Sequence, residues 1–313
     1  MLYYLSGFKT SFFGFNIFSY ITFRSGAAAI TAMFISLALG PWMLQRLVAW
    51  GLVHKPKVWG PEQHAKKSGV PVAGGLLIMM SLLAAIILWA RPGNRFVVIG
   101  EVIILVFTAL GFFDDWTKIA AKRVTGRSEG ISSRFKFMLQ IAVAGALAFY
   151  LAINPSNAMF PLTVNVPFAK ELFLDLGVMY FFLLMLFFVG FTNSVNLTDG
   201  LDGLAIGNVI IAAGALLVFV YVAGHAKFSE YLKVVPVSDA GELTVVLAAM
   251  IGAGLGFLWF NANPAQVFMG DTGSLPLGAL LVFVSIAAKQ ELLLPIIGGV
   301  FLLEAGSVMA QIT

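Results

Sequence analysis

Cysteine is absent from this 313-residue chain, and both charged residues and histidines are scarce. Without cysteine the chain has neither a disulfide framework nor a thiolate metal site. The three histidines (His54, His64 and His225) are scattered and provide no cluster of imidazole ligands. A metal ion bound by this chain would therefore be held by oxygen atoms, which favours Mg2+ or a similar hard cation.

The low charge content identifies the class of protein. Only 11% of the residues are charged, 60% are hydrophobic and the mean hydropathy is +0.95. An ordinary soluble domain is about a quarter charged. The composition therefore excludes an ordinary soluble protein and indicates an integral membrane protein.

Apolar runs near the length of a membrane-spanning helix, about 20 residues, recur along the whole chain. We predict an all-α, polytopic bundle that forms a single membrane domain over residues 1–313. The aromatic-rich 24 residues at the N-terminus resemble an interfacial segment more than a removable signal peptide. We expect nine transmembrane helices, at residues 25–45, 76–90, 96–113, 137–153, 172–191, 204–223, 243–260, 272–288 and 292–311.

The basic residues give the orientation of these helices. Most of the 19 Lys and Arg fall in the segments after the first and third spans, and the positive-inside bias makes that side cytoplasmic. The N-terminus is then outside and Thr313 inside. The polar breaks with grouped carboxylates follow the third, fifth and seventh spans and face the same side; their acids are Asp114, Asp115, Asp199, Asp202 and Asp271.

Asp114 and Asp115 lie at the end of the third span, where a helix C-terminus already carries partial negative charge. Grouped carboxylates beside a membrane suggest a cation site. Neighbouring residues of a helix diverge by about 100°, so one carboxylate could help bind a metal while the other faces a substrate proton. The alternative is a pair of hydrated helix-end residues. Lys118 and Lys122 follow on one helical face that suits phosphate, or that anchors anionic headgroups.

The break at residues 193–203 combines two Asn with two Asp and has no basic residue. Asp202 lies just before the next helix, where it could serve as an N-cap. Capping would leave Asn193, Asn196 and Asp199 unexplained.

The break around Asp271 has flanking glycines that could expose backbone amides to a ligand. Phe268 offers a ring for stacking on a base, although a lone aromatic residue more often packs in a core.

Four motifs together resemble one known family, the phospho-N-acetylmuramoyl-pentapeptide transferases of the polyprenyl-phosphate N-acetylhexosamine-1-phosphate transferase superfamily. The resemblance covers essentially the whole chain in order and spacing. The motifs are Gly60-Pro-Glu-Gln-His-Ala-Lys-Lys67, Gly111-Phe-Phe-Asp-Asp115, Asn196-Leu-Thr-Asp-Gly-Leu-Asp-Gly-Leu-Ala205 and Phe268-Met-Gly-Asp-Thr-Gly-Ser274.

The resemblance implies an enzyme of peptidoglycan synthesis that depends on Mg2+. Such an enzyme transfers phospho-MurNAc-pentapeptide from UDP-MurNAc-pentapeptide to undecaprenyl phosphate, which forms lipid I and releases UMP. The reaction is expected at the cytoplasmic face of the bacterial inner membrane. Membrane lipid is then a partner, a homodimer stays open, and no nucleic acid is expected.

The same resemblance assigns roles to individual residues. Asp271 is expected to be the principal Mg2+ ligand, with Asp114 and Asp115 as the other catalytic residues; Asp114 would position or deprotonate the lipid phosphate. The residues that match the substrate pocket are Lys67, Lys118, Lys122, Lys136, Asn193, Asn196, Asp199, Gly200, Leu201, Asp202, Asn261 and Phe268.

Two departures from the family pattern leave alternatives open. The family usually continues through a His-rich loop into a tenth span, so this chain is expected to be truncated at its C-terminus, which leaves its activity open. The segment 69–75 also lacks the hydroxyl residues common in the family, which weakens the choice of sugar donor. The alternatives are a transferase that uses UDP-N-acetylglucosamine and, more distantly, a cation transporter.

Overall fold

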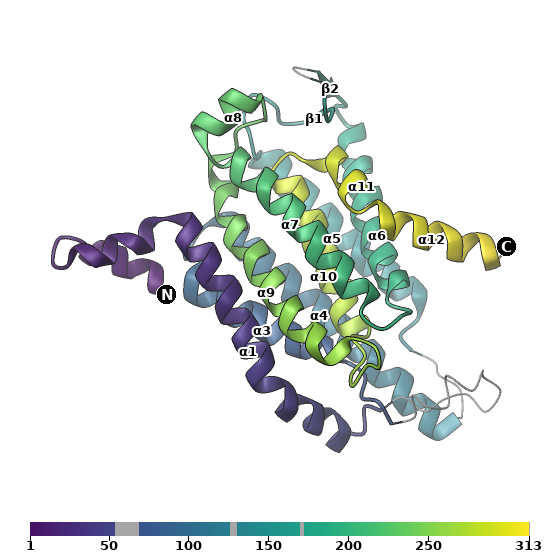
Figure 1. Cartoon of the computed structure of the whole chain (residues 1–313). Coiled ribbons are helices and arrows are strands. Elements are labelled where there is room, and N and C mark those ends of the chain that lie inside the picture. Colours follow the sequence, from purple (N-terminus) through teal and green to yellow (C-terminus); the bar gives the residue numbers. More distant parts are fainter. Residues whose placement is uncertain (54–68, 126–129, 170–171, 313) are drawn as a thin grey trace.

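The computed structural model describes residues 1–53, 69–125, 130–169 and 172–312. Long helices lie side by side in a bundle, as predicted for an all-α membrane protein (Figure 1). The main helices are α1 (Ile21–Ala49), α3 (Gly75–Trp89), α4 (Arg95–Thr125), α5 (Ser133–Ile153), α6 (Met179–Thr198), α7 (Leu204–Ala223), α9 (Leu243–Asn261), α10 (Asp271–Ala287) and α12 (Gly299–Ile312). The short elements are η1 (Leu2–Phe8), η2 (Phe13–Ser19), α8 (Ala226–Leu232), η3 (Ser238–Glu242), η4 (Glu291–Leu293), α11 (Leu294–Ile297) and the strands β1 (Thr163–Asn165) and β2 (Phe173–Asp175).

The predicted number of nine spans is not confirmed. Six helices in the described part of the chain are long and apolar enough to cross a membrane, or seven if the bent pair near the C-terminus counts as one span. Helices α3 and α10 are apolar but have only 15 and 17 residues. The last predicted span is broken at Gly298, where the direction of the helix changes by 69°.

The fifth span begins later than predicted because its first residues form a hairpin instead. Strands β1 and β2 pair in antiparallel fashion, with Thr163 opposite Asp175. They lie with α8 at one end of the bundle (Figure 1). Helix α6 then starts at Met179, so the predicted boundary at residue 172 was wrong.

Helix α10 forms the centre of the bundle. All of its residues are buried, and it packs against α3, α4, α6 and α7. Within hydrocarbon a helix satisfies its own backbone polar groups, so an apolar sequence can be enclosed on every side. The first turn of α10 is polar, and this turn carries Asp271.

Small residues allow α1 and α9 to pack closely. A Cβ atom added at Gly252 would lie 1.9 Å from the carbonyl oxygen of Ala29, and one at Gly256 would lie 2.8 Å from that of Met33. Small residues are typical of helix contacts in membranes because they let the backbones approach.

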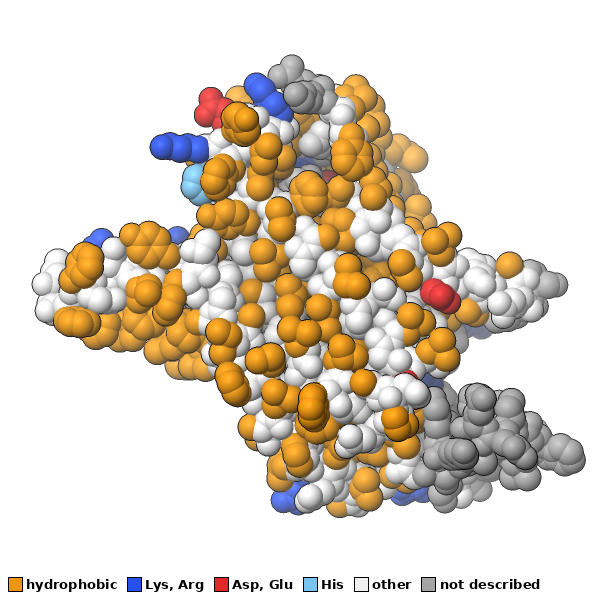
Figure 2. All heavy atoms as spheres, viewed as in Figure 1, with side chains coloured by type: hydrophobic (Ala, Val, Ile, Leu, Met, Phe, Trp, Pro, Cys, Tyr) orange, Lys and Arg blue, Asp and Glu red, His pale blue; other side chains and the backbone are white. Residues whose placement is uncertain are grey.

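Hydrophobic side chains cover the flank of the bundle, and most of the Lys and Arg in view lie toward its ends (Figure 2). A buried ion pair lies inside one end, where Arg24 contacts Glu242 through two N–O pairs of 2.6 and 2.7 Å. Because Arg24 is at the start of α1 and Glu242 precedes α9, this pair joins the two helices at the end opposite to the acidic cluster described below.

Candidate active site

Three carboxylates from two helices meet at one end of the bundle. Asp114 and Asp115 lie in α4, and Asp271 is the first residue of α10; one oxygen of each carboxylate lies within 4.8 Å of the other two. All three residues are buried. Their approach depends on Gly111 of α4, because a Cβ atom there would lie 2.1 Å from the carbonyl oxygen of Asp271. The structure thus joins two acidic motifs that lie far apart in the sequence.

Asp115 holds the N-terminus of α10. Its carboxylate accepts hydrogen bonds from the hydroxyl of Thr272 (2.6 Å), the backbone N–H of Thr272 (3.0 Å) and the backbone N–H of Asp271 (3.3 Å). The first N–H groups of a helix have no partner within the helix, and the N-cap residue of α10 is Gly270, which has no side chain. Asp115 therefore caps α10 from the neighbouring helix.

Two lysines lie against the other carboxylates. Lys118 Nζ is 2.6 Å from Asp114 Oδ2 and 3.2 Å from Asp271 Oδ2. Lys136 Nζ, which comes from α5, is 3.1 and 3.2 Å from the same two oxygens. Asp114 Oδ1 also accepts the backbone N–H of Ile131 at 2.8 Å. The cluster therefore places two ammonium groups against Asp114 and Asp271, two carboxylates from different helices.

The cluster fits a hard divalent cation. Carboxylate oxygens are the ligands that Mg2+ prefers, and Asp114, Asp115 and Asp271 supply three carboxylates against two ammonium groups. A cation bound at Asp114 and Asp271 would use the oxygens that the lysines now contact. The ammonium groups would then be available to negatively charged oxygens of a substrate.

The loop between α6 and α7 is tied to the same end of α10. Asp199 Oδ2 accepts the backbone N–H of Gly270 at 3.1 Å. Asn196 Oδ1 accepts the hydroxyl of Ser274 at 2.6 Å. The second acidic motif, after the fifth predicted span, therefore adjoins the carboxylate cluster.

Asp199 carries a raised pKa. Burial raises the pKa of its carboxyl to about 8, and the nearby Asp115 and Asp271 add to the rise, whereas the hydrogen bond from Gly270 lowers it. Burial and like charge both disfavour a carboxylate. The environment of Asp199 therefore favours its neutral form at neutral pH unless positive charge is brought near.

Asp202 and Asn261 hold the turn that precedes Asp271. Asp202 Oδ2 accepts the backbone N–H of Ala265 at 3.3 Å. Asn261 Oδ1 accepts the N–H of Gly203 at 3.0 Å, and its amide donates to Val267 O at 2.8 Å. The N-cap position of α7 is Gly203, so the alternative that Asp202 caps this helix was wrong.

The segment around Phe268 runs beside the N-terminus of α3. The N–H of Phe268 donates to Pro71 O and its carbonyl accepts the N–H of Gly74, both at 2.9 Å. A Cβ atom on Gly75 would lie 2.1 Å from the backbone nitrogen of Gly273. Gly75 therefore lets the start of α3 lie close to the backbone of the first turn of α10.

The remaining predicted residues are placed as follows. Gly200 and Leu201 are exposed in the loop between α6 and α7, with 67% of Leu201 accessible. Lys122 lies one turn beyond Lys118 in α4, whereas the ion pairs of the cluster involve Lys118 and Lys136. Lys67 and the motif at residues 60–67 lie outside the described residues.

The cluster adjoins one cavity at Lys136, and a second cavity lies beside the first. A polar one of about 470 Å³ is lined by Ser133, Arg134, Lys136, Phe137, Gln140 and Asn193. An apolar groove, also of about 470 Å³, shares Phe137 and Asn193 with it and continues between α6 and the segments α11 and α12. A polar space next to Lys136 thus leads into an apolar one.

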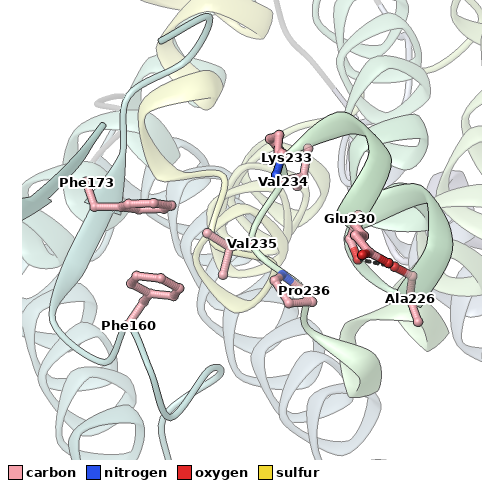
Figure 3. A pocket seen from close by; sticks show the side chains of 9 residues that line it. Phe160, Phe173, Ala226, Glu230, Lys233, Val234, Val235 and Pro236 are labelled. Atoms are coloured by element: carbon pink, nitrogen blue, oxygen red, sulfur yellow. Dashed lines mark hydrogen bonds between the residues drawn. The ribbon is translucent and has the colours of Figure 1, made fainter. Parts of the chain in front are cut away.

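A third cavity, of about 400 Å³, lies near α8 and the hairpin, at the other end of the bundle (Figures 1 and 3). Phe160 and Phe173 stack on one side of it, with their ring centres 4.4 Å apart. Glu230 and Lys233 contribute its charged side chains. This cavity lacks the group of carboxylates that marks the other end.

Two residues that the sequence analysis did not select make central contacts. Thr272 bonds to Asp115 from its side chain and its backbone. Gln140 pairs with Asn193, with 2.6 Å between Gln140 Oε1 and Asn193 Nδ2. The available signals were a hydroxyl residue directly after Asp271 and a single amide within a predicted span.

Comparison with known proteins gives the family. Residues 96–289 match the model of glycosyl transferase family 4. The phospho-N-acetylmuramoyl-pentapeptide-transferase of Endomicrobium trichonymphae is 46% identical over 313 residues, which is 100% of this chain and 86% of that protein. Proteins of the same name from Desulforapulum autotrophicum (43% identical, 85% of that protein) and Neisseria meningitidis serogroup C (45%, 86%) also match 100% of the chain. At this identity over its whole length, a chain whose carboxylates and lysines meet at one end of a membrane bundle belongs to the phospho-N-acetylmuramoyl-pentapeptide-transferase family.

Proposed function

We propose that this protein transfers phospho-MurNAc-pentapeptide from UDP-MurNAc-pentapeptide to undecaprenyl phosphate, giving lipid I and UMP. The observation that carries the proposal is the cluster of Asp114, Asp115 and Asp271 with two lysines, found in a chain of this family. Phosphoryl transfer between two anionic substrates needs positive charge at the phosphates and at the leaving group. With Mg2+ bound, the cation and the two ammonium groups would provide both.

In this proposal Asp271 and Asp114 would hold Mg2+, and the third carboxylate, Asp115, keeps the start of α10 in place. Bound Mg2+ supplies electrostatic stabilisation of the diphosphate and of the departing UMP. Lys118 and Lys136 would bind phosphate oxygens, because a cation at Asp114 and Asp271 would take the carboxylate oxygens that both ammonium groups contact within 3.2 Å. Asp114 positions or deprotonates the phosphate of the acceptor.

The nucleotide end of the donor is assigned to the surface next to Asp199. This surface comprises the loop between α6 and α7 and the turn before α10, which hydrogen bonds join. Phe268 would stack on the base. The other residues assigned to donor binding are Lys67, Lys122, Asn196, Gly200, Leu201, Asp202 and Asn261.

The acceptor is assigned to the joined cavities. The apolar groove between α6 and the segments α11 and α12 suits a polyprenyl chain, and the polar cavity beside Lys136 suits its phosphate. Phe137 and Asn193 line both, so one amphipathic lipid can occupy the two at once. This arrangement favours a lipid acceptor over a soluble one.

The proposed orientation puts the cluster at the cytoplasmic face of the bacterial inner membrane, with the N-terminus outside. The support is the distribution of Lys and Arg along the sequence. The related proteins are named for the muramoyl-pentapeptide donor, which favours this donor over UDP-N-acetylglucosamine. The similarity to these transferases does not favour a cation transporter.

The test is UMP release from UDP-MurNAc-pentapeptide by purified protein with undecaprenyl phosphate and Mg2+. Release should need all three components and should be lost in Asp271→Asn. The matched control is Asp175→Asn, an exposed residue of β2, which should leave the rate unchanged. Full activity of Asp271→Asn, or the same rate with UDP-N-acetylglucosamine as donor, would contradict the proposal.

A further inference from the structure

Gln140 is a buried amide in a helix that is otherwise largely apolar. Only 1% of the residue is exposed, and a polar group enclosed among apolar side chains is costly unless it is hydrogen-bonded. Its partner is Asn193 of α6. Asn193 Nδ2 donates to Gln140 Oε1 at 2.6 Å, and Gln140 Nε2 donates to Asn193 Oδ1 at 3.4 Å. We call Gln140 and Asn193 the amide pair.

Both N–H groups of the Asn193 side chain already donate hydrogen bonds within the protein. A side-chain amide has two N–H groups, and Asn193 Nδ2 donates to Gln140 Oε1 and also to the backbone carbonyl of Val189 at 2.7 Å. No N–H of this side chain is left for a substrate phosphate. The geometry therefore gives Asn193 a role between helices and argues against donation to a ligand.

The amide pair joins α6 to α5, the helix that brings Lys136 to the catalytic cluster. Lys136 precedes Gln140 by one turn on the same face of α5, and its ammonium contacts Asp114 and Asp271. On α6, Asn196 follows Asn193 by about one turn and accepts the hydroxyl of Ser274 of α10. The pair thus connects α5 through α6 to the helix that carries Asp271.

Helix α5 packs against α6 and makes few direct contacts with α4. An apolar cavity of about 310 Å³ separates parts of the two helices; its lining includes Val98, Val102 and Val106 of α4 and Val143, Leu147 and Tyr150 of α5. The position of α5 therefore depends mainly on its contacts with α6.

We propose that Gln140 is a positioning residue of the transferase: by pairing with Asn193 it fixes α5 on α6 and so keeps the ammonium of Lys136 between Asp114 and Asp271. The inference rests on the proposed function for its kinetic consequences. Gln140 touches no reacting atom, and it acts through Lys136.

The first experiment exchanges the two amides. Gln140→Asn and Asn193→Gln each change the combined length of the pair by one methylene, and the double exchange restores it. We expect each single variant to lower kcat about 5- to 30-fold, as for the loss of an interhelical hydrogen bond in a membrane, with KM for the UDP donor within about twofold. The double variant should recover to within about threefold of the unaltered protein. If it is as slow as the slower single variant, the inference is wrong.

The second experiment tests whether Gln140 acts through Lys136. In a double-mutant cycle, Gln140→Leu should lower kcat in the unaltered protein and have little further effect when Lys136→Met is present. Gln290→Leu is the matched control, since Gln290 is also buried but lies after α10 at the opposite end. Its effect should be unchanged by Lys136→Met. Additive effects of Gln140→Leu and Lys136→Met would overturn the inference.

A third measurement does not depend on turnover. Lys136 contacts the oxygens that would hold a cation, so Lys136→Met should tighten Mn2+ binding, measured by the loss of the free-ion signal in electron paramagnetic resonance. Gln140→Leu should also tighten it, whereas Gln290→Leu should not. No change in Gln140→Leu would contradict the inference even if the protein released no UMP, while absence of UMP release from the unaltered protein would contradict the proposed function alone.

Discussion

The contact between Thr272 and Asp115 gives the sharpest test of how α10 is held. The hydroxyl of Thr272 donates to Asp115 Oδ2 at 2.6 Å, and Thr272 itself is fully buried. Thr272→Val keeps nearly the same shape and removes this donor. Two backbone N–H groups still bond to Asp115, so we expect the variant to fold.

The size of the effect follows from the charge of the acceptor. A hydrogen bond to a charged group contributes about 1.5–3 kcal/mol. If the whole loss appeared in the barrier through a displaced Asp271, kcat would fall about 10- to 150-fold, since about 1.4 kcal/mol corresponds to a factor of ten. We expect the loss to be divided, with kcat about tenfold lower and the thermal midpoint lowered by a few degrees.

The assay is UMP release combined with thermal unfolding in detergent. Thr272→Ser keeps the hydroxyl and should retain most of the activity. Thr244→Val is the matched control, because Thr244 is also buried and its hydroxyl has no hydrogen-bond partner among the residues that the structure describes. Removing such a hydroxyl should be neutral or slightly stabilising. If Thr272→Val matched Thr244→Val in both rate and midpoint, the capping role of Asp115 would be refuted.

Three further predictions concern the same end of the bundle. Gly111→Ala should abolish activity or folding because its Cβ would lie 2.1 Å from the Asp271 carbonyl oxygen. The control Gly207→Ala has no atom within 4 Å of the added Cβ and should leave the thermal midpoint equal or higher. An active and stable Gly111→Ala would contradict the described approach of α4 to α10. Lys118→Met should tighten Mn2+ binding about tenfold or more while lowering turnover, since an ammonium about 4 Å away repels a cation by several kcal/mol at an effective dielectric constant of about 20; weaker binding in a titration would count against the shared oxygens. In protein stripped of metal, Asp199→Asn should become more stable relative to the unaltered chain as the pH rises from about 5 to 8. The pKa of Asp199 is raised to about 8 in the folded state, whereas in the unfolded chain this carboxyl ionises near pH 4, so folding of the unaltered chain becomes less favourable with rising pH. A difference in thermal midpoint that does not change with pH would contradict this.

The class of fold could be predicted because the hydrocarbon solvent allows few structures. Long apolar runs must form helices in which the backbone satisfies itself, so the bounds of α7 and α9 and the start of α4 are close to those expected from the sequence. The number of spans could not be obtained in this way. Apolar content does not reveal that the run at 292–311 bends at Gly298, or that residues 173–175 pair as a strand.

The residues of the candidate site were largely identifiable, but several contacts were not. Carboxylates in an apolar chain are costly wherever they are placed, which is why Asp114, Asp115 and Asp271 stood out. Thr272 and Gln140 did not stand out, because the role of a hydroxyl or an amide depends on its hydrogen-bond partner, which the sequence does not show. Asn261 was selected for substrate, and its hydrogen bonds to the backbone of Gly203 and Val267 could not be foreseen from the sequence.

The sequence by itself determined that this chain is a helical membrane protein, that its grouped acids follow three apolar runs on one side, and which family it resembles. Composition and spacing decide these properties because they depend on local helix formation and on transfer to lipid. Only the tertiary structure decided that Asp115 caps α10, that Lys118 and Lys136 share the same two carboxylates, and that Gln140 meets Asn193. These contacts join distant segments, and they depend on the rotation and closeness of packed helices, which the order of residues along one helix does not specify.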